Sequence, residues 1–158
     1  MPQNLKFLES LATVHIDPAS TDGRFALLGM LSPSGDRPPL HVHADEDEGF
    51  HVVEGELTLW VGDGEPVVLG PGRSVVAPHG VPHTYKVTSE TPVRMFVSST
   101  PGHFAKFVMA YGEPTDETEL TPFAGPPDLE RLESLANENG IQLLGPPGAL
   151  PNGGTMPS

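Results

Sequence analysis

Short apolar runs separated by tight-turn signals are the feature that most constrains the fold of this chain. Turn clusters such as Gly62-Asp63-Gly64 and Gly70-Pro71-Gly72 separate the apolar runs. Glycine and proline supply the dihedral angles that turns need. Roughly eight short strands at such intervals predict an antiparallel β-sandwich or barrel. We expect strands at 14–16, at 25–32, on both sides of Glu54-Gly55 within 40–61, and at 67–69, 75–77, 84–87 and 93–98.

Length and charge narrow the class of protein. The chain has 158 residues, which is room for one domain. It carries 21 Asp and Glu against 8 Lys and Arg, a net charge of −13. A phosphate-binding surface needs a positive field, so we expect no nucleic-acid and no membrane partner. The absence of cysteine excludes a disulfide framework and thiolate metal ligands. With no signal-like start and no membrane-length apolar run, we expect a cytoplasmic protein.

The sequence changes character after residue 100. Thr100-Pro101 is typical of an N-cap followed by proline, and the apolar spacing after it predicts a helix ending at Gly112. An acidic, Pro-rich connector, 113–128, leads to a second helix that Asp128 would cap and Asn139-Gly140 would end. We expect residues 145–158 to be frayed. The barrel would occupy 1–100, with 101–158 as a helical and Pro/Gly-rich extension of the same domain.

Three histidines and one glutamate suggest a metal site. His41 and His43 lie at i and i+2 of an extended segment, so both imidazoles leave the same strand face. Glu48 precedes an apolar strand and would point inward, whereas Asp45, Glu46 and Asp47 are interpreted as a solvated loop. His83 would supply the fourth ligand. Three imidazoles and one carboxylate suit one divalent transition metal, Fe, Ni, Mn, Co or Zn.

The spacing of these residues resembles the two motifs of the cupin superfamily. Gly35, His41, His43, Glu48 and Gly55 match the first motif, and Gly72, Pro78, Gly80 and His83 match the second. The second motif usually ends in Asn, where this chain has Val87. The resemblance implies a double-stranded β-helix, a jelly-roll-type barrel with the metal in its mouth, and these three histidines and Glu48 as ligands.

The residues after 100 resemble the C-terminal extension of bacterial quercetin 2,3-dioxygenase-like monocupins. Pro101-Gly102-His103-Phe104 and the segment 140–147 carry this resemblance. It implies an enzyme that uses O2 to cleave an enol- or phenol-containing aromatic or polyketide-like molecule, with Glu48 as both ligand and catalytic base. Strand alternation and the resemblance give these expected pocket residues: Phe50, Val52, Tyr85, Val87, Met95 and Val97.

Two alternatives to a dioxygenase stay open at this stage. One is a non-redox cupin cyclase or isomerase that uses its metal only to polarise a carbonyl group. The other is a small-molecule-binding cupin without turnover, because one fold hosts many functions. Short cupin barrels expose strand edges, so a homodimer through those edges is expected. We assign no ligand role to the remaining histidines, His15, His51, His79 and His103.

Overall fold

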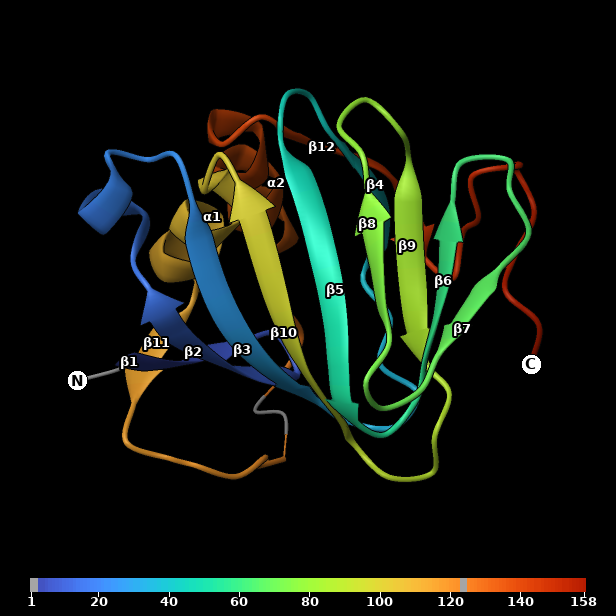
Figure 1. The fold of residues 1–158 in the computed structure, drawn as a ribbon, viewed down its shortest axis with the longest axis horizontal. Coiled ribbons are helices and arrows are strands. Elements are labelled where there is room, and N and C mark those ends of the chain that lie inside the picture. Colours follow the sequence, from blue (N-terminus) through green and yellow to red (C-terminus); the bar gives the residue numbers. More distant parts are fainter. Residues whose placement is uncertain (1–2, 123–124) are drawn as a thin grey trace.

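A computed structural model of the protein describes residues 3–122 and 125–158. The chain folds into two facing antiparallel sheets (Figure 1). The larger sheet has seven strands in the order β11-β1-β2-β3-β10-β5-β8. Its strands are β1 (Gln3–Phe7), β2 (Ser10–Ile16), β3 (Ala26–Ser32), β5 (Asp47–Glu54), β8 (Ser74–Ala77), β10 (Val93–Thr100) and β11 (Glu113–Thr115). The smaller sheet has five strands in the order β12-β4-β9-β6-β7. Its strands are β4 (Pro39–His43), β6 (Leu57–Val61), β7 (Val67–Leu69), β9 (His83–Val87) and β12 (Ile141–Pro147).

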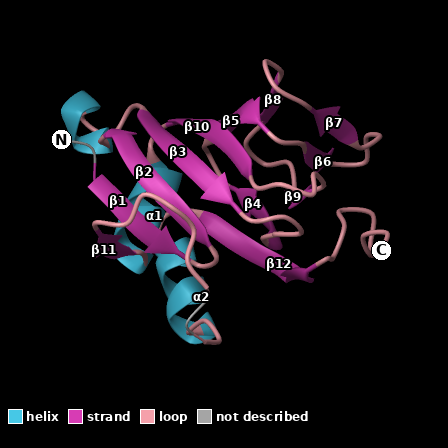
Figure 2. Cartoon of the chain, turned by 90° about the horizontal axis from the view of Figure 1, so that it is seen from below, coloured by secondary structure: helices cyan, strands magenta, loops and turns pink. Residues whose placement is uncertain are grey.

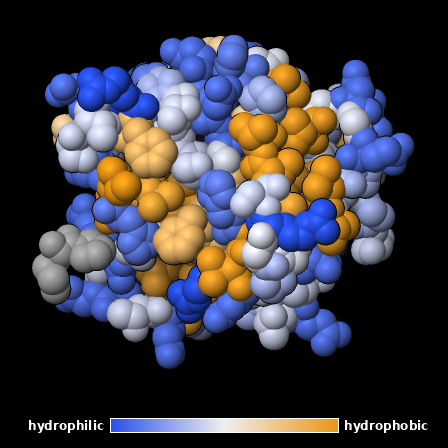
Figure 3. Space-filling view, viewed as in Figure 1, coloured by the Kyte–Doolittle hydropathy of each residue, from blue (hydrophilic) through white to orange (hydrophobic). Residues whose placement is uncertain are grey.

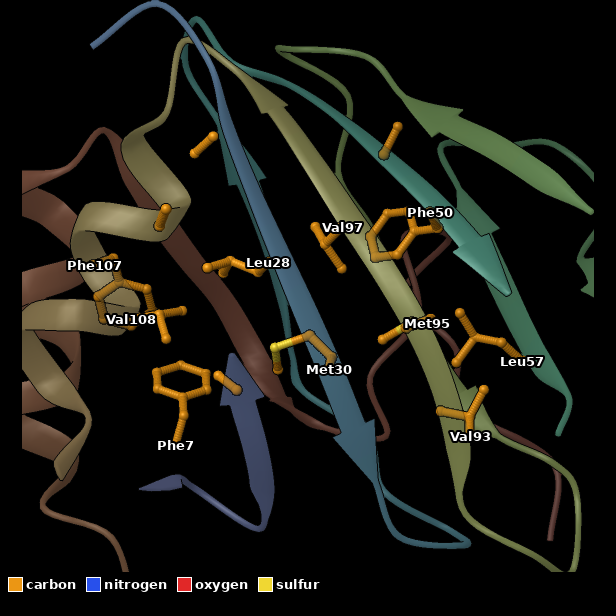
Figure 4. Close-up of a cluster of buried hydrophobic side chains, with 14 of the residues drawn as sticks. Phe7, Leu28, Met30, Phe50, Leu57, Val93, Met95, Val97, Phe107 and Val108 are labelled. Atoms are coloured by element: carbon orange, nitrogen blue, oxygen red, sulfur yellow. The ribbon is translucent and has the colours of Figure 1, made fainter. Parts of the chain in front are cut away.

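The hydrophobic core lies between the two sheets and follows the two-residue period of the strands. In β3 and β10 every second side chain is fully buried, as expected when one face of a strand covers a core. The register of this pair places Met95 opposite Met30 and Val97 opposite Leu28, and these side chains meet Phe50 in the same layer (Figure 4). The central strands β3, β5 and β10 could be predicted because the turns beside them are marked by residues close to them in the sequence.

Helices and a short 3-10 turn lie at one end of the sandwich, beside β1 and β11 (Figure 2). Phe7 packs edge-to-face against three aromatic rings of the first helix, with centroid distances of 5.5 to 6.3 Å, and so joins the N-terminal strand to the segment that follows β10. No helix of the described ranges is long and apolar enough to cross a membrane. The elements are η1 (Pro18–Thr21), α1 (His103–Tyr111) and α2 (Leu129–Glu138).

Three expectations about the chain ends are wrong. Thr100 does not cap α1, because it is the last residue of β10 and the N-cap position of α1 is Gly102. Residues 145–158 are not uniformly frayed, because β12 pairs along β4 up to Pro147 and the side chains of Leu150 and Met156 are buried. The strands β1, β11 and β12 were not expected. β11 and β12 pair with β1 and β4, which are distant in sequence, whereas β1 also pairs with β2, the next strand along the chain. Within the expected connector, Phe123 and Ala124 lie outside the described residues.

The outer face of the larger sheet carries several exposed apolar side chains (Figure 3). Val53, Val76 and Phe96 are each more than a third exposed. They belong to β5, β8 and β10, neighbouring strands of this sheet. On the other side of β10 in this sheet, β2 pairs with β3, and β1 pairs with β11 of the same chain.

Candidate metal centre

Both sheets contribute to one buried cluster of three histidines and one glutamate. His41 and His43 come from β4, and His83 begins the neighbouring strand β9, where its Cα pairs with that of His41. Glu48 comes from β5 in the opposite sheet. All four side chains are buried, and one ligand atom from each lies within 4.8 Å of the other three. The structure therefore brings together the four residues predicted as ligands.

The cluster holds buried polar atoms that no protein group satisfies. Within the described residues, Nε2 of His43, Oε2 of Glu48 and Nε2 of His83 have no hydrogen-bond partner. The first two atoms lie 2.8 Å apart, but their orientation does not form a hydrogen bond. Buried polar atoms normally have partners, and three imidazole nitrogens with one carboxylate oxygen form a ligand set for a divalent transition metal. The cluster could hold such an ion.

Three of the four side chains have the protonation state of metal ligands. Burial lowers the pKa of His41 to about 3, and burial lowers the pKa of His83 as well, so both are neutral. Burial alone would raise the pKa of Glu48, but the adjacent His43 lowers it to about 2 and keeps the carboxylate ionised. Neutral imidazole and ionised carboxylate are the forms that bind metals. The fourth, His43, differs: burial lowers its pKa, but the carboxylates of Glu48 and Glu46 raise it to about 10, so it would release its Nε2 proton on binding an ion.

Each histidine directs Nε2 inward because its Nδ1 is held from behind. Nδ1 of His41 lies 2.8 Å from the carbonyl oxygen of Pro39, and Nδ1 of His83 lies 3.3 Å from that of Val81. Carbonyl oxygens accept, so both rings carry their proton on Nδ1. Such partners fix the tautomer and ring orientation of metal-binding histidines.

Glu46 performs this task for His43, and the sequence analysis missed it. The interpretation of Glu46 as a solvated loop residue is wrong: its side chain is 1% exposed, and Oε1 lies 2.6 Å from Nδ1 of His43. Its Oε2 accepts the backbone N–H of Phe104 at 2.8 Å, at the start of α1, where Gly102 offers no side-chain cap. The sequence did not indicate this role, because Glu46 stands in a run of four acidic residues, 45–48. Only the conformation of the loop determines that its carboxylate points inward.

A cavity of about 70 Å³ adjoins the cluster. His41 and Glu48 line one part of it, and Ser10, Asp36 and Tyr85 also line it. The flanking segments close it: β1, α1, α2 and β12 supply most of its apolar wall, which includes Phe7, Phe104, Phe107, Leu132, Ile141 and Leu143. The segments after residue 100 therefore cover the cluster, a point that the sequence left open.

Comparisons with known proteins agree with this geometry. The cupin domain profile matches residues 28–99, the segment that contains β3 to β10 and all four candidate ligands. Residues 28–99 form a cupin domain. The double-stranded β-helix fold predicted from the two motifs is thereby confirmed.

Sequence and structural relatives support the same fold. Quercetin 2,3-dioxygenase of Bacillus subtilis (strain 168) is 35% identical over 132 residues, which are 84% of this chain and 36% of that protein. This chain thus spans little more than a third of its relative. The Cnp3 cupin domain of Schizosaccharomyces pombe gives a TM-score of 0.54 at 13% identity, covering 64% of this chain and 67% of that one. A Klebsiella pneumoniae protein with a double-stranded β-helix domain gives 0.51 at 20%, covering 60% and 78%.

The cupin barrel places the six expected pocket residues in two environments. Tyr85 lines the cavity beside the cluster, with its ring 5.9 Å from that of Phe50. The other five do not line it, because their strands direct the side chains into the hydrophobic core; these are Phe50, Val52, Val87, Met95 and Val97. Alternation along a strand identifies the inward face, but it does not say which inward residues reach the cavity.

The remaining histidines lie away from the cupin cluster. His51 contacts the hydroxyls of Ser74 and Ser98 on the outer sheet face. The other three are at separate sites: His15 against Phe96, His79 at 2.8 Å from Asp47, and His103 at 3.6 Å from Asp45.

Proposed function

We propose that this protein is a metal-dependent dioxygenase that cleaves an enol- or phenol-containing aromatic or polyketide-like small molecule with O2. The observation that carries the proposal is the four-residue cluster, with its unpartnered buried atoms, beside a mostly apolar cavity. The similarity to a protein named quercetin 2,3-dioxygenase supports this reaction class.

The proposed roles follow from the atoms available at the cluster. A bound Fe, Ni, Mn, Co or Zn ion would supply Lewis-acid polarisation of a chelating substrate oxygen and, if redox-active, a path for electrons to O2. His41, His43 and His83 would hold the ion, together with Glu48. Glu48 would also be the catalytic base, the role implied by the resemblance: one carboxylate oxygen would hold the ion and the other would accept the substrate hydroxyl proton.

The wall of the cavity favours a flat apolar substrate body. Phe7, Phe104 and Phe107 present aromatic rings to it, with Leu132 and Ile141. Its volume of about 70 Å³ is small beside the ~300–1,000 Å³ of sites for drug-sized ligands. A substrate of two or three rings therefore enters only when the wall formed by α1, α2 and β12 moves outward.

The experiment that tests this function combines metal analysis with O2 consumption. The purified protein should contain one divalent transition metal per chain, consume O2 with at least one member of a flavonol panel, and release carbon monoxide. The matched variant His83→Ala should abolish O2 uptake, whereas His79→Ala should retain it. A zinc protein that transforms its substrate without O2 would contradict the dioxygenase and indicate a non-redox cyclase or isomerase.

The expected homodimer through strand edges is proposed as well, at the edge strand β8 and the exposed apolar side chains beside it on the larger sheet. Val53, Val76 and Phe96 supply the apolar side chains, and cyclic dimers are the commonest oligomers. Light scattering after size exclusion should give twice the chain mass, and Phe96→Ser should shift it towards one chain. A monomer in the unmodified protein would contradict this.

A further inference from the structure

A second polar cluster lies on the cavity, apart from the metal ligands. It consists of Ser10 on β2, Asp36 in the turn before β4, and Tyr85 on β9, all of which line the cavity. The Ser10 hydroxyl donates to Oδ2 of Asp36 at 3.2 Å and lies 2.7 Å from the Ser32 hydroxyl. The metal-site proposal uses none of these groups.

The strand β9 sets the separation of this cluster from the metal ligands. The carbonyl oxygen of Asp36 accepts the backbone N–H of Val87, which lies four residues beyond His83 on the same strand. Strands rise about 3.3 Å per residue, so the backbone of Asp36 lies about 13 Å along the strand from that of His83. Tyr85 lies midway. A ligand that contacts both ends of the cavity must be longer than one aromatic ring.

Asp36 is an unusual group to find in a mostly apolar wall. Burial, reinforced by the nearby Glu9, raises its pKa to about 6. The Ser10 hydroxyl donates to it at 3.2 Å and the Glu9 carboxyl group lies beside it, while an ionised carboxylate has about four acceptor positions. A carboxylate held in an unfavourable environment beside a cavity is typical of a binding site.

We propose that Asp36, assisted by Ser10 and Tyr85, binds a hydroxyl group of the substrate that is remote from its metal-chelating oxygen. The inference rests on the proposed function and adds a specificity-determining residue to it: Asp36 would favour a substrate with a phenolic hydroxyl at the end opposite its chelating enol or phenol over one without that hydroxyl. The remote hydroxyl donates to the Asp36 carboxylate, and the apolar wall contacts the rings between the two ends.

Anaerobic binding titrations of three flavonols on the metal-containing protein test this inference. The probes are 3-hydroxyflavone and its two derivatives with one additional hydroxyl, at the 7 or at the 4′ position, so that either end of the molecule can present a remote hydroxyl. One derivative should bind the unmodified protein about tenfold more tightly than the parent, the size expected for a hydrogen bond to a charged group. In Asp36→Asn this affinity ratio should fall to about one, and in Ser10→Ala it should fall partway. The control Asp63→Asn, in the exposed β6–β7 turn, should keep the affinity ratio of about ten between the derivative and the parent flavonol.

The outcomes separate the inference from the proposed function. Equal affinities for all three flavonols, or a ratio that persists in Asp36→Asn, would overturn the inference, while O2 uptake with the parent flavonol would leave the dioxygenase standing. If none of the three binds, the inference falls, and O2 uptake with the wider flavonol panel decides the proposed function separately. Circular dichroism and thermal melts check that the variants fold, and should Asp36→Asn not fold, the ratio in Ser10→Ala decides the matter: an unchanged ratio overturns the inference.

Discussion

The barrel and the segments that flank it contribute different parts of the candidate site. The barrel, residues 28–99, supplies all four candidate ligands from three strands in two sheets. The flanking segments supply no ligand, yet they form most of the apolar wall of the cavity. Under the proposed function, the barrel would hold the metal and the remote-hydroxyl site at Asp36, and the flanking segments would contact the apolar body of the substrate.

Glu46 is where these two regions meet. One of its oxygens contacts the ligand His43, and the other accepts the backbone N–H of Phe104 at the start of α1. The position of α1 and the orientation of a candidate metal ligand are therefore connected through the buried carboxylate of Glu46. The following predictions test the division between the regions, beginning with the largest expected effect.

Truncation of the wall should destabilise the whole protein if the flanking segments fold as part of the barrel. Phe107 is buried and packs edge-to-face on Phe7. Phe107→Ala should lower the free energy of unfolding by about 3–5 kcal/mol, the usual range for a buried phenylalanine, in urea titration. Leu129→Ala, at a position that is 65% exposed, should change it by less than about 0.5 kcal/mol. An unchanged midpoint for Phe107→Ala would show that the wall is not an integral part of the fold.

Removal of a candidate ligand should weaken metal binding, the property that we assign to the barrel. His83→Ala should weaken metal binding more than about 100-fold, since loss of a partner behind a ligand already weakens it about 10–100-fold. Competition with a chromogenic chelator measures this affinity. His79→Ala removes an exposed imidazole bound to Asp47 and should bind metal as the unmodified protein does. Equal affinities for the two variants would refute the assignment of His83.

Glu46→Gln should produce an intermediate loss and test the connection between the regions. The amide oxygen can still accept one hydrogen bond but not serve His43 and Phe104 with two anionic oxygens. Metal affinity should fall about 10–100-fold, without the further loss expected for a ligand. Asp45→Asn, an exposed neighbour in the same acidic run, is the matched control. A Glu46→Gln protein with undiminished affinity would make Glu46 a helix cap only.

The smallest effect concerns the stability of the far end of the cavity. The pKa of Asp36 is about 6 in the folded protein against an ordinary value of 3.8, so the folded state binds more protons between these values and stability falls as pH rises through that window. Asp36→Asn should therefore stabilise the protein by roughly 1–2 kcal/mol above pH 6. The gain should vanish below about pH 4. Urea titrations at pH 4 and pH 7.5 measure it, and a pH-independent difference would contradict the raised pKa.

The sequence predicted the barrel well because its determinants are local. The turns around Gly62 and Gly72, the i, i+2 spacing of His41 and His43, and the position of Glu48 before an apolar strand are all readable over a few residues. Each one limits the register of a strand and the face on which its side chains lie.

The rest could not be predicted because it depends on contacts distant in sequence. β12 pairs with β4 about a hundred residues earlier, and no local pattern in its Gly- and Pro-rich sequence indicates that partner. Glu46 differs from Asp45 and Asp47 only in which way the loop turns it. Val87 was expected in the pocket from strand alternation and the resemblance to the second motif, whereas its side chain packs in the core and its N–H donates to the backbone carbonyl of Asp36.

X-ray absorption spectroscopy of the metal-containing protein tests the central claim most directly. The account predicts one divalent transition metal per chain, coordinated by three imidazole nitrogens and at least one carboxylate oxygen, with one imidazole lost from the spectrum in His83→Ala. A metal coordinated only by oxygen atoms, or an imidazole shell that His83→Ala leaves unchanged, would contradict it.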